Sequence, residues 1–315
     1  MKNENMQNNN FLAPICLFVY SSFNETKRTV ESLQKNTLAP ESLLFIFSDG
    51  AENIYTIEKV KNVREYIRTV TGFANVTIYE SEVNKGLANS IISGVTKIIS
   101  DFDKVIVIED DLLLSTNFLG FMNQSLNFYK EEKKILSISG FSFPIKYNTG
   151  YKYDVAFSLR ASSWGWATWK DRWENIDWEV KTYKTFQRNI LKRCKFNRGG
   201  SDMSHMLDKQ MSGKINSWAI RFCYHQFEND LFDVFPTISK VINIGFGENA
   251  TNTKKGDFRF RTNLDTTNKQ FFNLQKEIKI SLTNQIQFYW HFSIIMRILS
   301  KIIDFSIKKN KIIIH

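Results

Sequence analysis

The sequence predicts an α/β fold, a doubly wound and mainly parallel sheet flanked by helices. Three observations predict it: strand-like runs alternate with helical segments over the first 140 or so residues, the runs are apolar on both faces, and the helices between them are about 10 to 17 residues long. Strands that are apolar on both faces are typical of a parallel sheet covered on both sides. We therefore expect one α/β domain over residues 13–140.

The predicted strands are short runs rich in β-branched and aromatic residues. The first helix follows Asn24 as its N-cap, with Val30 and Leu33 at helical spacing. Two more amphipathic helices are expected over 54–70 and 87–100. The strands are ICLFVY (15–20), LLFIFSDG (43–50), NVTIYE (75–80), KVIVIEDD (104–111) and ILSISG (135–140).

The alternation stops near residue 141, and residues 141–270 are interpreted as a smaller α+β lobe that shares the cleft of the first domain. The segment 158–178 holds five tryptophans within fifteen residues. A basic helical stretch to about residue 195 and a helix over 202–212 follow it. Residues 233–252 end in Gly, Asn and Thr, as loops do.

Both termini differ from the rest of the chain. Residues 1–12 are polar and Asn-rich, without the apolar stretch of a signal peptide, so a disordered tail and a cytoplasmic protein are expected. Residues 271–315 form a C-terminal segment whose part from 285 onward is apolar, aromatic and fringed with cations. This pattern fits an amphipathic helix lying on an anionic membrane surface, and equally a terminal helix docked on the protein's own core.

The net charge of +10 and the pI near 9.3 favour an anionic partner. Nothing resembles a zinc finger, a basic zipper or an aromatic ribonucleoprotein motif, so nucleic acid is not expected as that partner. Cys16, Cys194 and Cys223 are scattered and form no CxxC pair, which indicates reduced thiols rather than disulfides or a zinc site.

Polar residues follow three of the predicted strands. In open α/β sheets the ligand lies beyond the carboxyl ends of the strands, so these residues should converge on one rim. They are Ser48 and Asp49 after the second strand, Asn84, Lys85 and Gly86 after the third, and Glu109, Asp110 and Asp111 at the end of the fourth.

The three consecutive acids, Glu109, Asp110 and Asp111, should repel one another and resist burial. A divalent cation resolves this conflict, and hard oxygen ligands at a strand end suit Mn²⁺ or Mg²⁺, which would complete its shell with diphosphate oxygens and water. The alternative is a solvated acidic turn. A phosphate-cradling loop such as GxxxxGK[ST] is absent from the sequence, which argues against a metal-dependent phosphoryl-transfer enzyme.

Over residues 13–252 the order of these motifs resembles that of the GT-A glycosyltransferases, the nucleotide-sugar-dependent enzymes of the family 2 type. EDDLLLSTNF is particularly similar to the acidic motif of the N-acetylglucosaminyltransferase I-like branch. The resemblance implies a GT-A type sheet, a nucleotide diphosphate sugar as donor and a divalent metal.

Carried over by position, the resemblance implies donor binding around the rim. Asp111 matches the metal ligand, and Glu109 and Asp110 would face the ribose and sugar. Ser22 falls in the loop that approaches the nucleotide, and Asp49 matches the acid that binds the base. Asn84, Lys85 and Gly86 match the turn that covers the donor, and Lys240 stands where a basic residue faces the diphosphate. Each of these segments also has an alternative without a ligand: Asp49 before Gly50 could be a simple turn former, and residues 84–86 could be a plain loop that leads into a helix.

The tryptophan-rich segment resembles the part of this branch that shapes the acceptor side of the cleft. Flat indole faces suit sugar rings, and we expect Trp164, Gly165 and Trp166 to line the acceptor site, although a core role is the more common one for a single tryptophan. The other tryptophans of the segment are expected in the core: Trp169, Trp173 and Trp178.

One position departs from the family pattern. The acid that deprotonates the acceptor in this branch is replaced by Ser217. Four acids nearby in the sequence remain as candidates for the general base, with Asp208 preferred weakly over the others, because sequence cannot show which lies within reach of the acceptor oxygen. The others are Asp202, Asp171 and Glu174.

Together these features predict a metal-dependent, inverting glycosyltransferase, peripheral on the inner face of the cell membrane. It would act on a glycan or lipid-linked glycan in bacterial surface polysaccharide or lipooligosaccharide synthesis. The alternative is a non-catalytic relative that binds glycan or scaffolds a membrane complex, and metal-dependent nucleotide binding distinguishes the two.

Overall fold

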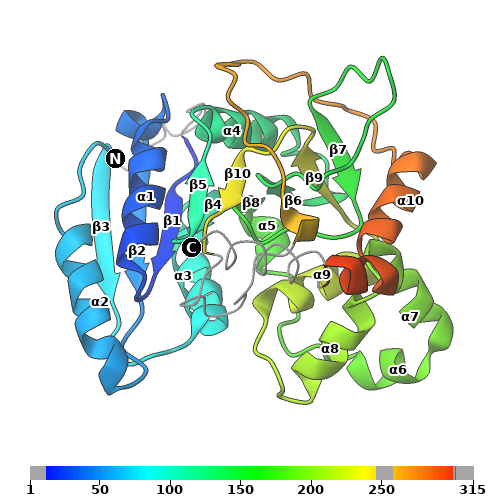
Figure 1. Ribbon diagram of the computed structural model, residues 1–315, viewed down its shortest axis with the longest axis horizontal. Helices are drawn as coiled ribbons and strands as arrows, with labels where there is room; N and C mark the ends of the chain where they lie inside the picture. The colour runs from blue at the N-terminus through cyan, green and yellow to red at the C-terminus, as the bar shows by residue number, and fades with distance from the viewer. Residues whose placement is uncertain (1–11, 246–257, 301, 303–315) are drawn as a thin grey trace, which may run out of the picture.

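The computed structural model describes residues 12–245, 258–300 and 302. Eight strands form one sheet in the order β3-β2-β1-β4-β8-β6-β9-β7 (Figure 1). The strands are β1 (Ile15–Val19), β2 (Leu43–Ser48), β3 (Asn75–Glu80), β4 (Lys104–Glu109), β6 (Ile135–Ser139), β7 (Val155–Ser158), β8 (Trp166–Trp169) and β9 (Phe232–Pro236). The predicted α/β fold with a mainly parallel sheet is confirmed: β3, β2, β1 and β4 are mutually parallel.

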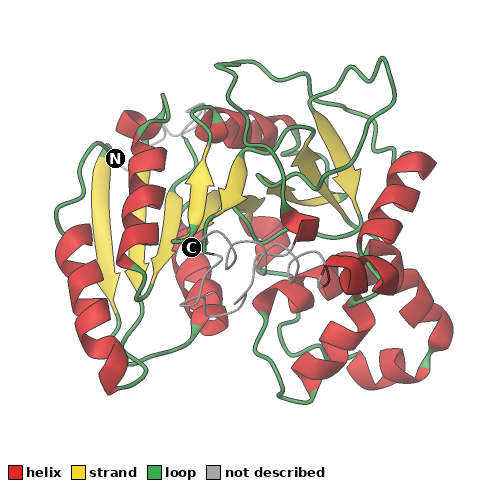
Figure 2. Ribbon diagram, viewed as in Figure 1, coloured by secondary structure: helices red, strands yellow, loops and turns green. Residues whose placement is uncertain are grey.

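Helices cover both faces of this sheet (Figure 2). Alternate residues of β1 enter two different cores: Ile15 and Leu17 pack with α1 (Phe23–Gln34), α2 (Ile54–Ile67) and α4 (Phe118–Phe128). Cys16 and Phe18 pack instead with α3 (Leu87–Asp101) and α9 (Trp218–Glu228). Burial on both faces explains why these strands read as uninterrupted apolar runs.

The helix boundaries follow local chemistry. The side chain of Asn53 caps α2 and forms a capping box with Thr56. The predicted cap of the first helix is wrong, because α1 begins at Phe23, two residues earlier than expected, with Ser22 rather than Asn24 as its N-cap. Val30 and Leu33 are fully buried, as their spacing predicts.

Strand pairing continues beyond residue 140. β8 lies antiparallel between β4 and β6, while β9 pairs with β6 and β7. The division into two lobes at this residue therefore stays a prediction, and what the structure adds is that residues 141–270 supply three strands to the same sheet. Three helices, α6 (Tyr183–Arg188), α7 (Ile190–Phe196) and α8 (Met203–Met211), form a cluster with one side of α9 and share a small core. The short helix α5 (Lys170–Trp173) packs instead beside α3 through Trp173.

A small antiparallel ribbon adjoins the end of β4. It pairs β5 (Leu112–Leu114) with β10 (Val241–Asn243). Downstream, residues 261–281 pass back over α4 as an extended strap. Within the strap, Asp265 donates its N–H to the Ser239 carbonyl. Tyr129, at the end of α4, donates its hydroxyl to the carbonyl of Gln275 in the strap. Residues 246–257, which lie between the ribbon and the strap in the sequence, are outside the described residues.

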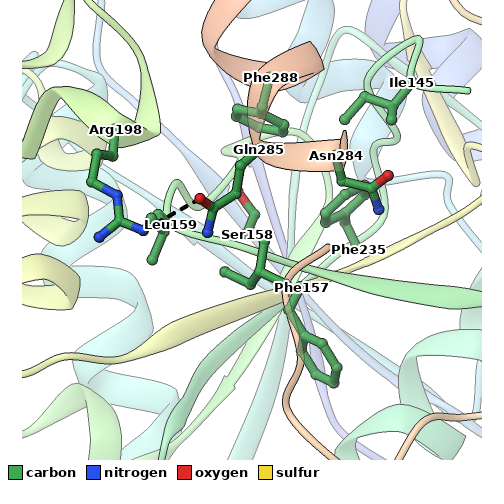
Figure 3. A pocket seen from close by; sticks show the side chains of 10 residues that line it. Ile145, Phe157, Ser158, Leu159, Arg198, Phe235, Asn284, Gln285 and Phe288 are labelled. Carbon is green, nitrogen blue, oxygen red and sulfur yellow. Dashed lines mark hydrogen bonds between the residues drawn. The ribbon is translucent and has the colours of Figure 1, made fainter. Parts of the chain in front are cut away.

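The C-terminal helix α10 (Leu282–His291) docks on the core through Phe288 and, just beyond its end, Phe292, which are 7% and 0% exposed. Figure 3 shows Gln285 of α10 accepting a hydrogen bond from Arg198 at 3.3 Å, beside a cavity of about 20 Å³ that has room for one water molecule. The helix predicted from 285 onward is thus interrupted near Ser293, and a second helical stretch occupies residues 294–300.

Docking leaves a second apolar face of this region exposed. The exposed side chains, between 42% and 72% accessible, are Leu282, Ile286, Tyr289, Trp290, Ile294, Ile295, Ile298, Leu299 and Ile302. The structure therefore bears out the core-docked alternative for one face and leaves the membrane alternative open for the other. Helices long and apolar enough to cross a bilayer do not occur in the described residues. Residues 1–11 of the predicted disordered tail lie outside the part of the chain that the structure describes.

Candidate functional site

The carboxyl ends of β1, β2 and β4 meet at one rim, as expected for parallel strands. Tyr20 follows β1 and links both of its neighbours. Its backbone N–H donates to the Asp110 carboxylate at 3.0 Å, and its hydroxyl accepts from the N–H of Glu52 at 3.1 Å. The three predicted groups of polar residues are thereby brought together.

Asp49 organises the turn between β3 and α3. Its carboxylate accepts N–H groups of Lys85 and Gly86, each at 2.9 Å, and that of Gly50 at 2.9 Å. The side chain is nearly buried, with the residue 8% exposed. Three charge-assisted bonds to backbone give this carboxylate a structural task as well as any contact with a base.

The turn itself presents its polar groups to the rim. Asn84 donates its side-chain amide to the Gly50 carbonyl at 2.8 Å, and the Lys85 side chain is exposed. Gly86 has φ of 74° with no atom within 4 Å of a hypothetical Cβ, so conformation rather than space favours glycine there. Gly50 differs: a Cβ would lie 2.4 Å from the Val83 carbonyl carbon, so this glycine permits the two loops to touch.

Arg64, on α2, stabilises the same rim by donating hydrogen bonds to residues at the ends of β2 and β3. Its guanidinium donates to the carbonyls of Asp49 and Ser81 at 3.2 and 2.6 Å and to the Ser48 hydroxyl at 3.1 Å. Sequence reasoning missed this residue, because on an amphipathic helix an arginine looks like any solvated cation. Ser22 stays at the start of α1, partly exposed, where its carbonyl accepts the N–H of Thr26.

The acid triplet is an electrostatically unfavourable group as it stands. Burial, and then the charges of Asp111 and Asp110, raise the pKa of Glu109 well above its usual range. Burial and the charge of Asp111 raise the pKa of Asp110 to about 7. Among the described residues, no lysine or arginine contributes to the pKa shifts of the three acids. A cation from outside would remove this cost.

Asp110 and Asp111 have different surroundings. One oxygen of Asp110 accepts from Tyr20 and from the Thr26 hydroxyl at 3.3 Å, and its carbonyl accepts from Thr29 at 2.8 Å, so it fastens α1 to the end of β4. Oδ1 of Asp111, by contrast, is buried and has no hydrogen-bond partner. A buried carboxylate oxygen without a partner is costly, and this is the observation that fits a metal ligand.

The protein side chains do not form a complete metal site by themselves. Within the described chain, no three His, Cys, Asp or Glu side chains are grouped for a cation. A single Asp111 oxygen nevertheless fits Mg²⁺ or Mn²⁺, which is commonly held by one or two carboxylates and filled out by substrate phosphates and water.

The structure does not bring Lys240 to the rim, which corrects the expectation that its amine faces the donor phosphates. Its ammonium donates to the Asp265 carboxylate, and the two side chains are 4% and 2% exposed. The amine also lies over the Phe272 ring, 4.7 Å from its centroid. Phosphate could reach it only after this buried pair had separated.

Trp166 is a core residue, which corrects its assignment to the acceptor site. It is 1% exposed and stacks on Trp173 and Trp218 with ring centroids 5.7 and 4.8 Å away. Trp169 and Trp173 are buried, as predicted, at 3% and 2% exposure.

Trp164 and Gly165 lie on the rim side, because β8 begins at Trp166 opposite the carboxyl half of β4. The Trp164 ring is partly exposed and packs edge-on against Phe141 at 4.6 Å. Gly165 has φ of 59°, and its carbonyl accepts the N–H of Gly140. Acceptor contact therefore stays a prediction for Trp164 alone among the tryptophans of this cluster.

Asp208 is poorly suited to act as the base, which corrects the weak preference for it. Arg193 donates to both of its oxygens at 2.9 and 2.7 Å, and Tyr183 donates at 3.0 Å. The Arg193 bond holds the pKa of Asp208 below its usual range. All three residues belong to the helical cluster α6–α8 rather than to the rim.

The other base candidates are also engaged. Arg160 donates twice to Asp202, at 2.8 and 3.3 Å. Asp171 pairs with Lys133 and Arg172 just after β8, whose end lies beside Lys104 at the start of β4, so this acid is at the edge of the sheet opposite the rim. Glu174 follows one turn later. The base therefore remains unassigned.

Comparisons with known proteins add little to this geometry. Neither a protein-family model nor a curated protein matches the chain. The fold is similar to that of the mannosyltransferase PcManGT from Pyrobaculum calidifontis, solved with GDP-Man and Mn²⁺, with 9% identity, 72% of each chain covered and a TM-score of 0.37. It is also similar to the galactosyltransferase LgtC with donor and acceptor sugar analogues (11% identity, 68% of this chain and 70% of that one, TM-score 0.35).

A third similar structure is UDP-glucose pyrophosphorylase complexed with UDP-glucose, with 12% identity, 73% of this chain and 92% of that one covered, and a TM-score of 0.35. Likeness at these identities and TM-scores carries no functional argument.

Proposed function

We propose that this protein is a glycosyltransferase that moves a sugar from a nucleotide diphosphate donor to a glycan or lipid-linked glycan acceptor. The observation that carries the proposal is the acid triplet at the end of β4, where Oδ1 of Asp111 is buried without a partner. Beside it, at the same rim, stands a turn built on Asp49 that exposes Lys85. The divalent metal that accompanies a nucleotide diphosphate would supply positive charge beside the three acids.

The roles of individual residues follow from their positions. Asp111 would hold Mn²⁺ or Mg²⁺, and the metal would stabilise the charge that develops on the departing nucleotide diphosphate. The turn of Asn84, Lys85 and Gly86 would cover the donor, with the exposed Lys85 amine as a point charge for a phosphate. Direct displacement with inversion and a base from outside the helical cluster complete the proposed mechanism.

The acceptor and the location in the cell are part of the same proposal. A lipid-linked glycan made during bacterial surface polysaccharide synthesis would be presented at the inner face of the membrane. The exposed apolar side chains of α10, of residues 294–300 and of Ile302 would bind there. The short turn Asn197–Gly199 after α7 adjoins α10 through the Arg198–Gln285 bond. The sequence from 181 to 200 holds seven Lys or Arg and no acid, which suits anionic lipid.

Nucleotide binding tests the catalytic part of the proposal. Unfolding of the wild type should be measured with UDP, GDP and CDP, each with and without Mn²⁺. A ligand at 100 times its Kd raises the free energy of unfolding by about 2.7 kcal/mol. We expect a metal-dependent rise for at least one nucleotide, which Asp111→Asn removes and the matched variant Asp208→Asn retains. Equal stabilisation of wild type and Asp111→Asn would refute the proposed site.

Vesicle flotation tests the membrane part. We expect the protein to float with phosphatidylglycerol vesicles and less with phosphatidylcholine. Tyr289→Ser combined with Trp290→Ser should abolish flotation, because their exposed rings, at 54% and 52%, are expected to enter the interface. The control is Tyr55→Ser on α2, which is 84% exposed at a different part of the surface. Equal flotation of all three proteins would contradict this assignment.

A further inference from the structure

The end of β10, in the short ribbon β5–β10, lies beside Asp111, although it is far from the acid motif in the sequence. Asn243, the last residue of β10, stands opposite Leu112 in the antiparallel register. The next residue, Ile244, donates its N–H to the Asp111 carbonyl at 2.8 Å. The end of β10 thus runs directly beside the backbone of the predicted metal ligand.

The Asn243 side chain lies close to the Asp111 carboxylate. Its oxygen accepts the N–H of Gly245 at 2.9 Å. Burial raises the pKa of Asp111, and the nearby Asn243 side chain opposes that rise. The amide therefore stands between the Asp111 carboxylate and the backbone that follows β10.

Gly245 completes the enclosure by having no side chain. A Cβ at this position would lie 2.4 Å from Oδ2, 2.8 Å from Cβ and 3.0 Å from Cγ of Asp111. Since ordinary contacts begin at 3.4 Å, the Asp111 carboxylate would have to move by about 1 Å to make room. The whole Asp111 side chain packs on this glycine.

These contacts act on one side of the carboxylate. Asn243 and Gly245 restrain it, while Oδ1 is left buried and without a partner. A ligand oxygen that is held in place by its neighbours and left otherwise unpaired is already oriented for a cation, so little freedom remains to be lost on binding.

We propose that Asn243 and Gly245 are positioning residues for the Asp111 metal ligand, orienting its carboxylate so that Oδ1 faces the cation. The inference rests on the proposed function, and it adds a second segment of the chain, 130 residues downstream of the acid motif, to the metal site. Sites of this kind commonly lose about 10- to 100-fold in metal affinity when a residue supporting a ligand is removed.

The experiment measures Mn²⁺ affinity directly, by electron paramagnetic resonance of free Mn²⁺ in the presence of the nucleotide found to bind. We expect Asn243→Ala and Gly245→Ala to weaken Mn²⁺ binding at least 10-fold. Matched controls are Asn127→Ala, whose amide oxygen accepts from the half-buried Lys104, and Gly120→Ala, which has a neighbouring atom no closer than 4.0 Å. Both controls should bind Mn²⁺ within twofold of wild type.

Two further measurements separate positioning from folding. Urea unfolding should show that both variants are folded under the assay conditions, and their metal-free nucleotide affinity should match that of the wild type. If they bind Mn²⁺ within twofold of wild type while Asp111→Asn does not, this inference is overturned and the proposed function stands. If wild type itself shows no nucleotide-dependent Mn²⁺ binding, the proposed function fails first.

Discussion

The buried pair of Lys240 and Asp265 allows a sharp test, because its structural role and the donor-binding role expected from the sequence predict opposite results. Lys240→Met keeps a flexible apolar stem of similar length between the rings of Phe121 and Phe272. It leaves the Asp265 carboxylate, 2% exposed, without its cation. Removing one partner of a buried ion pair costs about 3–5 kcal/mol, so the variant should unfold at a much lower urea concentration.

A second substitution should restore most of this loss. In Lys240→Met with Asp265→Asn, the charge is gone, yet an amide oxygen remains to accept the N–H of Thr267 at 2.8 Å. Replacing both charges of a buried pair is often neutral, so the double variant should lie within about 1–2 kcal/mol of the wild type. Equilibrium urea unfolding of the wild type, both single variants and the double variant measures the coupling.

The pair also predicts a dependence on pH. Burial opposes ionisation of Asp265, but hydrogen bonds from Lys240 and Thr267 outweigh it and hold its pKa at about 2. A carboxyl with a lowered folded-state pKa contributes stability that is present above its unfolded pKa of about 4 and lost as pH falls to about 2. The stability gap between wild type and double variant should therefore change over this window. A Lys240→Met protein as stable as wild type at pH 7, with a raised KM for the donor, would refute the reasoning.

Three other substitutions check the remaining assignments. Trp166→Ala should cost about 3–5 kcal/mol of unfolding free energy, because it empties a fully buried stack; a loss below about 1 kcal/mol would contradict the core assignment. Asp49→Asn should weaken nucleotide binding and cost about 1–3 kcal/mol, since an amide cannot accept at both the Lys85 and Gly86 N–H groups; unchanged affinity by calorimetry would argue against this role. Asp208→Asn, which breaks a half-buried surface pair worth about 1 kcal/mol, should leave sugar transfer within twofold of wild type, and complete loss of turnover would restore it as the base.

Local pattern predicted β1 to β4, β6 and α1 to α3, but it missed β5 and α4. β1, for example, buries alternate residues in two cores, and such burial leaves an uninterrupted apolar run in the sequence. The insertion of β8 antiparallel between β4 and β6 was not predictable in this way. It joins segments about 60 residues apart, and nothing in a local period specifies which strands will pair.

Side-chain direction was the main source of error at the site. Trp164 and Trp166 are two residues apart, which on a regular strand would place them on one face. Gly165 has φ of 59°, and this breaks the alternation, so that Trp164 packs on Phe141 while Trp166 enters the opposite core. Lys240 failed for a related reason: a lysine partnered by an acid 25 residues later is indistinguishable in sequence from one that faces solvent.

How the C-terminus is attached decides where this chain can be shortened. Phe292 contributes a fully buried ring, and Arg160 stacks on it at 4.1 Å while pairing with Asp202. A protein truncated before α10 would lack the buried rings of Phe288 and Phe292, and the Arg160 guanidinium would lose the ring on which it stacks. Loss of membrane binding by such a protein could therefore reflect unfolding rather than a missing membrane anchor. Trimming from residue 303 onward spares these contacts and is the cleaner way to ask what the last residues do.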